Sequence, residues 1–176
     1  MPGPTVDESA RIRAYLIAQA AKLTPTELAA KLRTDAAPLR DVAASVPSGK
    51  FHARPAEGEW SAAEVLTHVL EMNEHGQAAV TRILDEGVAP EGVATDNRPS
   101  ARTGIESGED FWRSFEPTRE KLLVRVAKAS GDEHPDPTIV HPWFGPLSWR
   151  EWTLFMRVHD LDHLRQLEGI AAALQA

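Results

Sequence analysis

Cysteine is absent from the 176 residues of this chain. Its absence excludes disulfide bonds, thiolate nucleophiles, iron–sulfur clusters and cysteine-ligated zinc sites, and it agrees with a reducing compartment. Basic residues are in the minority, with 19 Lys and Arg side chains against 26 Asp and Glu and a formal charge of −7. Because binding of phosphate groups needs clustered Lys and Arg, we expect no nucleic-acid partner.

Long apolar runs are also missing. No stretch of about 20 apolar residues is present to span a membrane, and the acidic segment 1–9 lacks the apolar core of a secretory signal. We therefore expect a cytoplasmic protein with no membrane partner. Serine-nucleophile motifs, glycine-rich phosphate loops and dinucleotide fingerprints are absent as well, which excludes the enzyme classes that depend on them.

What the sequence does contain is a set of strong helix starts. Segments 24–27, 61–64 and 148–151 each place a Ser or Thr three residues before a Glu. This pattern is a capping box, in which the two side chains bond each other's backbone amides at a helix N-terminus. We predict a further long helix from Ser107 and an additional N-terminal helix over about 7–22, from the spacing of their apolar residues.

These starts predict an all-α fold, namely a four-helix bundle with an extra N-terminal helix. We expect a single domain over residues 1–176, with its core at about 24–170. Two long connections, 87–106 and 130–147, separate the later helices, and connections of this length are typical of crossovers or functional lids. Within the second one, residues 139–140 are suited to a short extended segment.

The candidate site is a pair of histidines in the last predicted helix. His159 and His163 stand four residues apart, a spacing that stacks two side chains on one helix face. Apolar residues share this face, so we expect it to point inward, where an imidazole needs a partner. His68, on the inward stripe of another predicted helix, can supply a third imidazole to the same point.

Three neutral imidazoles are suitable ligands for zinc or a similar divalent ion. With no fourth protein ligand, one coordination position stays open to water or substrate, as in catalytic sites. The alternative is a set of core histidines hydrogen-bonded to Glu side chains or to the backbone. A carboxylate di-iron centre is disfavoured, because Asp160-x-x-His163 is the single near match to its Glu-x-x-His motif.

Two further residues are candidates for catalytic roles. Glu71 stands three residues after His68, where it can orient the imidazole or act as a base, or form a solvated flank. Gln166 stands one turn after His163, and we expect it to line the pocket. Glu64 also lies one turn from His68, but its place in a capping box explains it.

Two blocks of this sequence resemble the DinB-like superfamily of metalloenzymes. The first is WSAAEVLTHV at 60–69, and the second is HPWFGPLS at 141–148 followed by HDLDHLRQ at 159–166. The blocks occur in the family's order and separation, and the resemblance covers roughly residues 24–170. The chain departs from the pattern at Asp162, where relatives can carry a further histidine.

The resemblance implies a bundle of unusual connectivity, commonly a homodimer, that holds a divalent metal ion, Zn or Ni, on His68, His159 and His163. Some relatives transfer low-molecular-weight thiols. We therefore predict a metal-dependent thiol S-transferase that uses such a thiol on a small-molecule substrate. The alternatives are a metal-dependent hydrolase and a non-catalytic bundle that binds metal or dimerises.

Overall fold

The computed structural model describes residues 4–91 and 99–175. In this part of the chain the fold is all-α apart from one small hairpin, as predicted, and no helix combines the length and apolar character that a membrane crossing requires. The elements in chain order are α1 (Val6–Lys22), α2 (Pro25–Asp35), α3 (Ala37–Ser45), the 3₁₀ turn η1 (Ser48–Lys50), α4 (Ala62–Glu86), α5 (Gly108–Ala127), β1 (Ile139–His141), β2 (Gly145–Leu147) and α6 (Trp149–Gln175).

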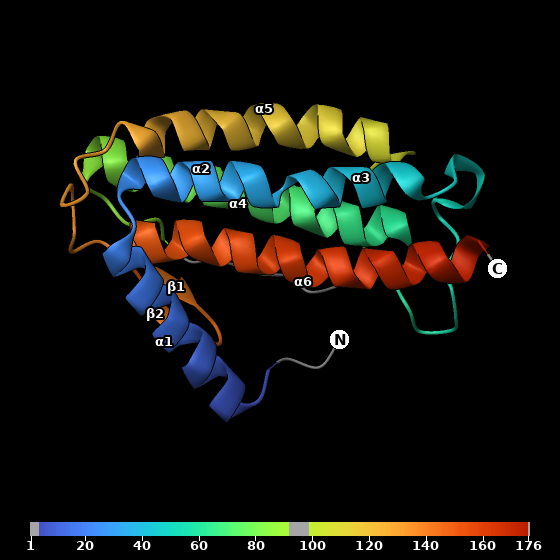
Figure 1. Cartoon of the computed structure of the whole chain (residues 1–176), viewed down its shortest axis with the longest axis horizontal. Coiled ribbons are helices and arrows are strands. Elements are labelled where there is room, and N and C mark those ends of the chain that lie inside the picture. Colours follow the sequence, from blue (N-terminus) through green and yellow to red (C-terminus); the bar gives the residue numbers. More distant parts are fainter. Residues whose placement is uncertain (1–3, 92–98, 176) are drawn as a thin grey trace.

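The bundle is made of helical rods that lie side by side (Figure 1). α2 and α3 follow each other along one rod, and α4, α5 and α6 form the others. The break between α2 and α3 falls at Ala36, and Pro38 occupies one of the first positions of α3. A proline is tolerated there, because its missing N–H would have no partner within the helix. The predicted four-helix core with an extra N-terminal helix is therefore the observed arrangement.

Hydrogen bonds at the helix ends explain where the helices begin and stop. Thr24 and Ser61 each accept a hydrogen bond from the amide of the glutamate three residues on, and that glutamate accepts from the capping residue's own amide. Ser148 and Glu151 form the same reciprocal pair. α4 ends at Gly87, whose φ of 68° lies in the left-handed region that favours glycine. The capping boxes predicted from the sequence are thus confirmed.

The two long connections differ in form. Residues 130–147 contain the antiparallel hairpin of β1 and β2, in the region expected to be extended. Residues 92–98 of the first connection lie outside the described part of the chain, and its role as a crossover or lid stays a prediction. Arg102 fastens the end of this connection to α4: its backbone N–H donates to Thr67 Oγ1 at 2.9 Å, and its guanidinium donates to both carboxylate oxygens of Glu74 at 2.7 Å.

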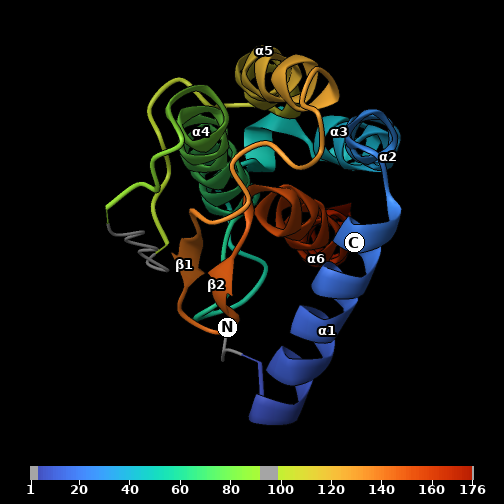
Figure 2. The same cartoon turned by 90° about the vertical axis from the view of Figure 1, so that its left-hand side faces the viewer.

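α1 lies across the bundle instead of inside it, and in Figures 1 and 2 it extends away from the four rods on the side of the hairpin. Arg150 of α6 holds its C-terminal end, because the guanidinium donates to the carbonyl oxygens of Ala20 and Leu23. Arg157, also on α6, donates to the Tyr15 hydroxyl at 3.2 Å. α1 is therefore fixed to α6 at two points along its length.

A buried ion pair crosses the otherwise apolar core of the bundle. Arg119 of α5 donates to the carboxylate of Asp160 on α6, with Nη1–Oδ2 at 2.8 Å and Nη2–Oδ1 at 3.3 Å. Its Nε donates to Oδ1 of Asn73 on α4 at 2.7 Å, and Asn73 donates in turn to the carbonyl of Phe115 at 3.1 Å. Because these buried groups satisfy one another, the network ties α4, α5 and α6 into one arrangement.

Candidate metal centre

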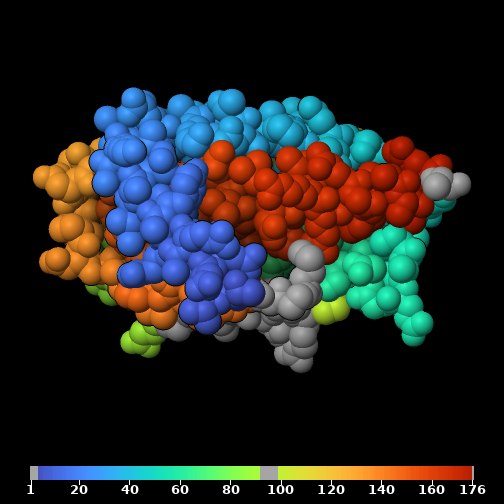
Figure 3. Space-filling view, turned by 60° about the horizontal axis from the view of Figure 1, so that its bottom comes forward, coloured from blue at the N-terminus to red at the C-terminus, as the bar shows by residue number. Residues whose placement is uncertain are grey.

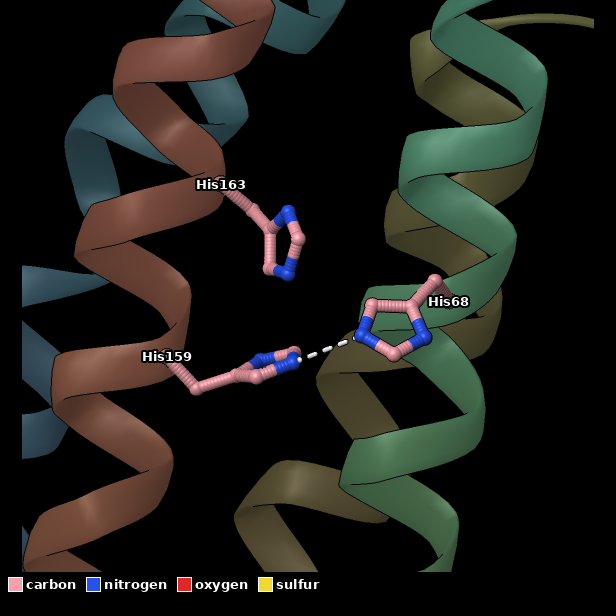
Figure 4. Close-up of side chains that lie close together, drawn as sticks. All are labelled: His68, His159 and His163. Carbon is pink, nitrogen blue, oxygen red and sulfur yellow. Dashed lines mark hydrogen bonds between the residues drawn. The ribbon is translucent and has the colours of Figure 1, made fainter. Parts of the chain in front are cut away.

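Three histidine rings from two helices converge at one point (Figure 4). His68 comes from α4, while His159 and His163 come from successive turns of α6. One ring nitrogen of each lies within 4.8 Å of the others, and the ring centroids are 4.4 to 4.9 Å apart. The four-residue spacing on α6 turns both of its rings toward α4. The convergence expected from the sequence is present in the structure.

The hydrogen bonds of the rings indicate which nitrogens can bind a metal. Nδ1 of His163 is 2.9 Å from Oε1 of Gln166. A carbonyl oxygen only accepts, so Nδ1 carries the proton and Nε2 keeps a free lone pair. Nε2 of His159 lies 3.0 Å from Nε2 of His68. Among the described residues, no ring is hydrogen-bonded to a Glu side chain or to the backbone, which was the alternative interpretation of the cluster.

Burial keeps the three imidazoles neutral. It lowers the pKa of His68 to about 4, with a further contribution from the charge of His163. It also holds the pKa of His159 well below its usual value and lowers that of His163. A neutral imidazole is the form that binds a metal ion, and nitrogen ligands of this type suit divalent ions such as those of Zn, Cu, Fe and Ni. In number, protonation state and proximity, the three side chains fit a divalent ion.

The rings open onto a cavity of about 1020 Å³. α1, the hairpin and α6 contribute to its walls. A large part of the lining is aromatic, from Tyr15, Trp60, Trp143, Phe144 and Phe155. Pockets of this size with apolar walls and a few polar groups are typical of sites for small organic molecules.

The two residues predicted to be catalytic lie in different surroundings. Gln166 lines the cavity and bonds His163, so the expectation that it faces the pocket is confirmed. The Glu71 side chain is 48% exposed and lies 3.9 Å from the guanidinium of Arg102. Three residues along a helix turn the direction by about 300°, so Glu71 lies beside the face of His68 and its carboxylate reaches the surface. Glu71 makes no hydrogen bond to the rings in the described residues, and a catalytic role of either Glu71 or Gln166 stays a prediction.

The capping role predicted for Glu64 is confirmed. Its carboxylate accepts from the amide of Ser61 at 2.8 Å and pairs with Arg54 at 2.5 Å. Both bonds favour the charged form, and the pKa of Glu64 is lowered although its partial burial acts in the opposite direction. With both bonds made, this carboxylate is not available to the histidines.

Sequence reasoning missed the ion pair of Arg119 and Asp160, although Asp160 is the residue directly after His159. A signal for it exists. Arg119 stands four residues after Phe115 and three before Leu122, in the apolar stripe of α5. A charged residue on an inward stripe needs a buried partner of opposite charge, and Asp160 meets that need.

We expect Gln166→Leu to lower the affinity for Zn²⁺ by roughly 10- to 100-fold, the range found for residues that hold a metal ligand in place. The substitution removes the acceptor for Nδ1–H of His163 and leaves that ring free to turn. Gln166→Glu, which keeps an acceptor, serves as the matched control. The affinities are measured by competition with a chromophoric chelator. Equal affinities for the leucine variant and the wild type contradict the expectation.

A second prediction concerns acid stability and His141 of β1, which lies beside the same cavity. Its Nδ1 accepts from the backbone N–H of Trp143 at 3.1 Å and of Phe144 at 3.3 Å, and burial lowers its pKa to about 4. Between pH 6.5 and 4 the unfolded chain therefore binds the proton and the folded chain does not. The free energy of unfolding falls as the pH falls through this range, by up to about 3 kcal/mol from this residue.

The test compares the wild type with His141→Asn, which keeps an acceptor but does not titrate. Urea denaturation is followed from pH 7 to pH 4 in the presence of a chelator, so that the metal-free forms are compared. We expect a smaller loss of stability for the variant. Parallel curves would show that His141 is not a source of the acid sensitivity.

Comparison with known proteins agrees with these features. The model of the DinB superfamily matches residues 31–167, a stretch that includes all three histidines of the cluster. A Bacillus subtilis (strain 168) protein, named as the uncharacterized protein YuaE, is 28% identical over 140 residues, which cover 72% of this chain and 86% of that protein. Because the family match spans most of the chain and its bundle, this protein belongs to the DinB superfamily.

Proposed function

We propose that the protein is a divalent-metal-dependent enzyme that transfers a low-molecular-weight thiol to a small organic electrophile. The observation that carries the proposal is the convergence of three neutral imidazoles at the wall of a cavity of about 1020 Å³. Thiol transfer by some relatives in the superfamily supports the choice of reaction. The family resemblance also supports a homodimer, and light scattering of the purified protein tests this.

Each part of the site has a stated role in this proposal. His68, His159 and His163 hold the ion, Zn²⁺ or Ni²⁺. When bound, such an ion is a Lewis acid that lowers the pKa of a thiol or water in its open position. Gln166 keeps the proton of His163 on Nδ1 and so directs Nε2 toward the site. The aromatic walls of the cavity bind the electrophile and exclude water from it.

The test is an assay of the metal-loaded protein with small thiols and a chromogenic electrophile such as 1-chloro-2,4-dinitrobenzene. We expect wild type to form the thioether, as the thiol sulfur replaces chloride on the ring and the thiol proton passes to solvent, and we expect no rate above background with His163→Ala. Hydrolysis of an ester in the absence of thiol, lost in the same variant, supports a metal-dependent hydrolase instead. If metal binds but neither reaction occurs, and metal removal only lowers the melting temperature, the protein is a non-catalytic metal-binding bundle.

A further inference from the structure

α1 is a wall of the cavity that lies outside the family match. The match begins at residue 31, whereas α1 ends at Lys22. The N-terminal segment nevertheless contributes Pro4, Thr5, Glu8, Arg11, Ile12 and Tyr15 to the cavity lining. In the space-filling view, α1 (blue) lies against α6 (red) and beside the hairpin segment (orange) (Figure 3). The N-terminal segment is therefore a part of the cavity wall that lies outside the matched residues.

The two faces of α1 have different surroundings. Ile12 lines the cavity and packs against buried residues of the core, while Ile17 is 41% exposed and takes no part in the lining. Arg11 lines the cavity, whereas Arg13 is exposed and does not. The helix thus offers matched pairs of residues, with one member of each pair at the cavity and one away from it.

The lining of the cavity carries two guanidiniums, of Arg11 and Arg165, and two carboxylates, of Glu8 and Asp162, so its formal charge is balanced although the whole chain carries −7. In the described residues, the Arg11 side chain makes a single hydrogen bond, to the carbonyl of Asp7 at 3.3 Å, and Arg165 makes no hydrogen bond or ion pair. The carboxylate of Glu8 is engaged at the start of α1, where it accepts from the amide and hydroxyl of Thr5 at 2.8 Å. Glu8 stays charged, but these bonds occupy its carboxylate, so the guanidiniums of Arg11 and Arg165 keep donors that are free for a ligand in the described part of the chain.

We infer that the cavity selects an organic anion, with its apolar or aromatic body between the aromatic walls and its anionic group on Arg11 and Arg165. Guanidinium groups bind carboxylate, sulfonate and phosphate through paired, charge-assisted hydrogen bonds. The aromatic walls suit a ligand with an apolar body, which describes an organic electrophile better than a polar thiol. We therefore assign the anion to the electrophilic substrate. The inference names the substrate class of the proposed enzyme and so rests on that proposed function.

The test uses two fluorescent probes of the same skeleton, 1-anilinonaphthalene-8-sulfonate and its neutral analogue N-phenyl-1-naphthylamine. We expect the full-length wild type to bind the sulfonate about tenfold more tightly than the neutral probe. Arg11→Met with Arg165→Met should remove that preference, while Arg13→Met should keep it. Ile12→Asp should weaken both probes about tenfold, and Ile17→Asp should change neither. Circular dichroism and melting temperatures verify that each variant is folded.

Two outcomes overturn the inference. One is equal affinity of the wild type for the two probes. The other is a loss of the preference in Arg13→Met as large as in the double variant. Every titration is made with chelator and again with Zn²⁺, and His163→Ala is included. If the wild type binds no Zn²⁺ but still prefers the sulfonate probe, the proposed metal-dependent enzyme is refuted while the anion site stands. The failure of the proposed function can thus be told from the failure of this inference.

Discussion

Replacing His159 or His163 by alanine is expected to lower the affinity for Zn²⁺ or Ni²⁺ by at least about 100-fold, because a three-nitrogen site becomes a two-nitrogen site. No further ligand can replace the lost histidine in the described part of the chain, because the cluster there consists of His68, His159 and His163 alone. The free energy of metal binding also stabilises the folded state. Added metal should therefore raise the melting temperature of wild type but not that of either variant.

His75 is the matched control for this experiment. It stands on α4, two turns after His68, and it is outside the cluster although its Nε2 is buried without a partner in the described residues. His75→Ala should keep both the metal affinity and the metal-dependent rise in melting temperature. Metal content is measured by elemental analysis after dialysis, and affinity by calorimetric titration. Equal metal content in the wild type and His163→Ala would rule out the proposed centre.

The largest loss of stability is expected for Arg119→Met, at roughly 3 to 5 kcal/mol. Arg119 and Asp160 are 4% and 6% exposed at their side chains, so the variant leaves a carboxylate in the core without its partner. Burial raises the pKa of the Asp160 carboxyl and the guanidinium of Arg119 lowers it, so the charged form depends on Arg119. Asn73 loses a hydrogen bond as well. Urea denaturation at pH 7 gives the free energy of unfolding.

Arg125→Met is the matched control, because Arg125 is on the same helix and also bonds to α4. Its partners Asp85 and Glu133 are partly exposed, and exposed ion pairs contribute about 0 to 1 kcal/mol. The double variant Arg119→Met with Asp160→Leu should recover most of the lost stability, since it removes the unpaired charge. If Arg119→Met costs no more than Arg125→Met, the ion pair does not lock the bundle.

The sequence by itself determined the features that depend on neighbours within one helical turn. Capping boxes such as Thr24 with Glu27 involve residues three positions apart, so their hydrogen bonds follow from local spacing. The same holds for His159 and His163, which share a helix face wherever the helix packs. An inward stripe that includes His68 then made the three-histidine cluster predictable.

Only the tertiary structure decided the features that join distant parts of the chain. Arg119 and Asp160 are 41 positions apart, and no local pattern selects that pairing. Glu71 and Gln166 each stand three residues after a histidine of the cluster, but the Glu71 side chain is exposed whereas Gln166 bonds His163 and lines the cavity. The position of α1 across the cavity likewise depends on contacts with α6 over more than 100 positions, which bring residues together only once the chain has packed.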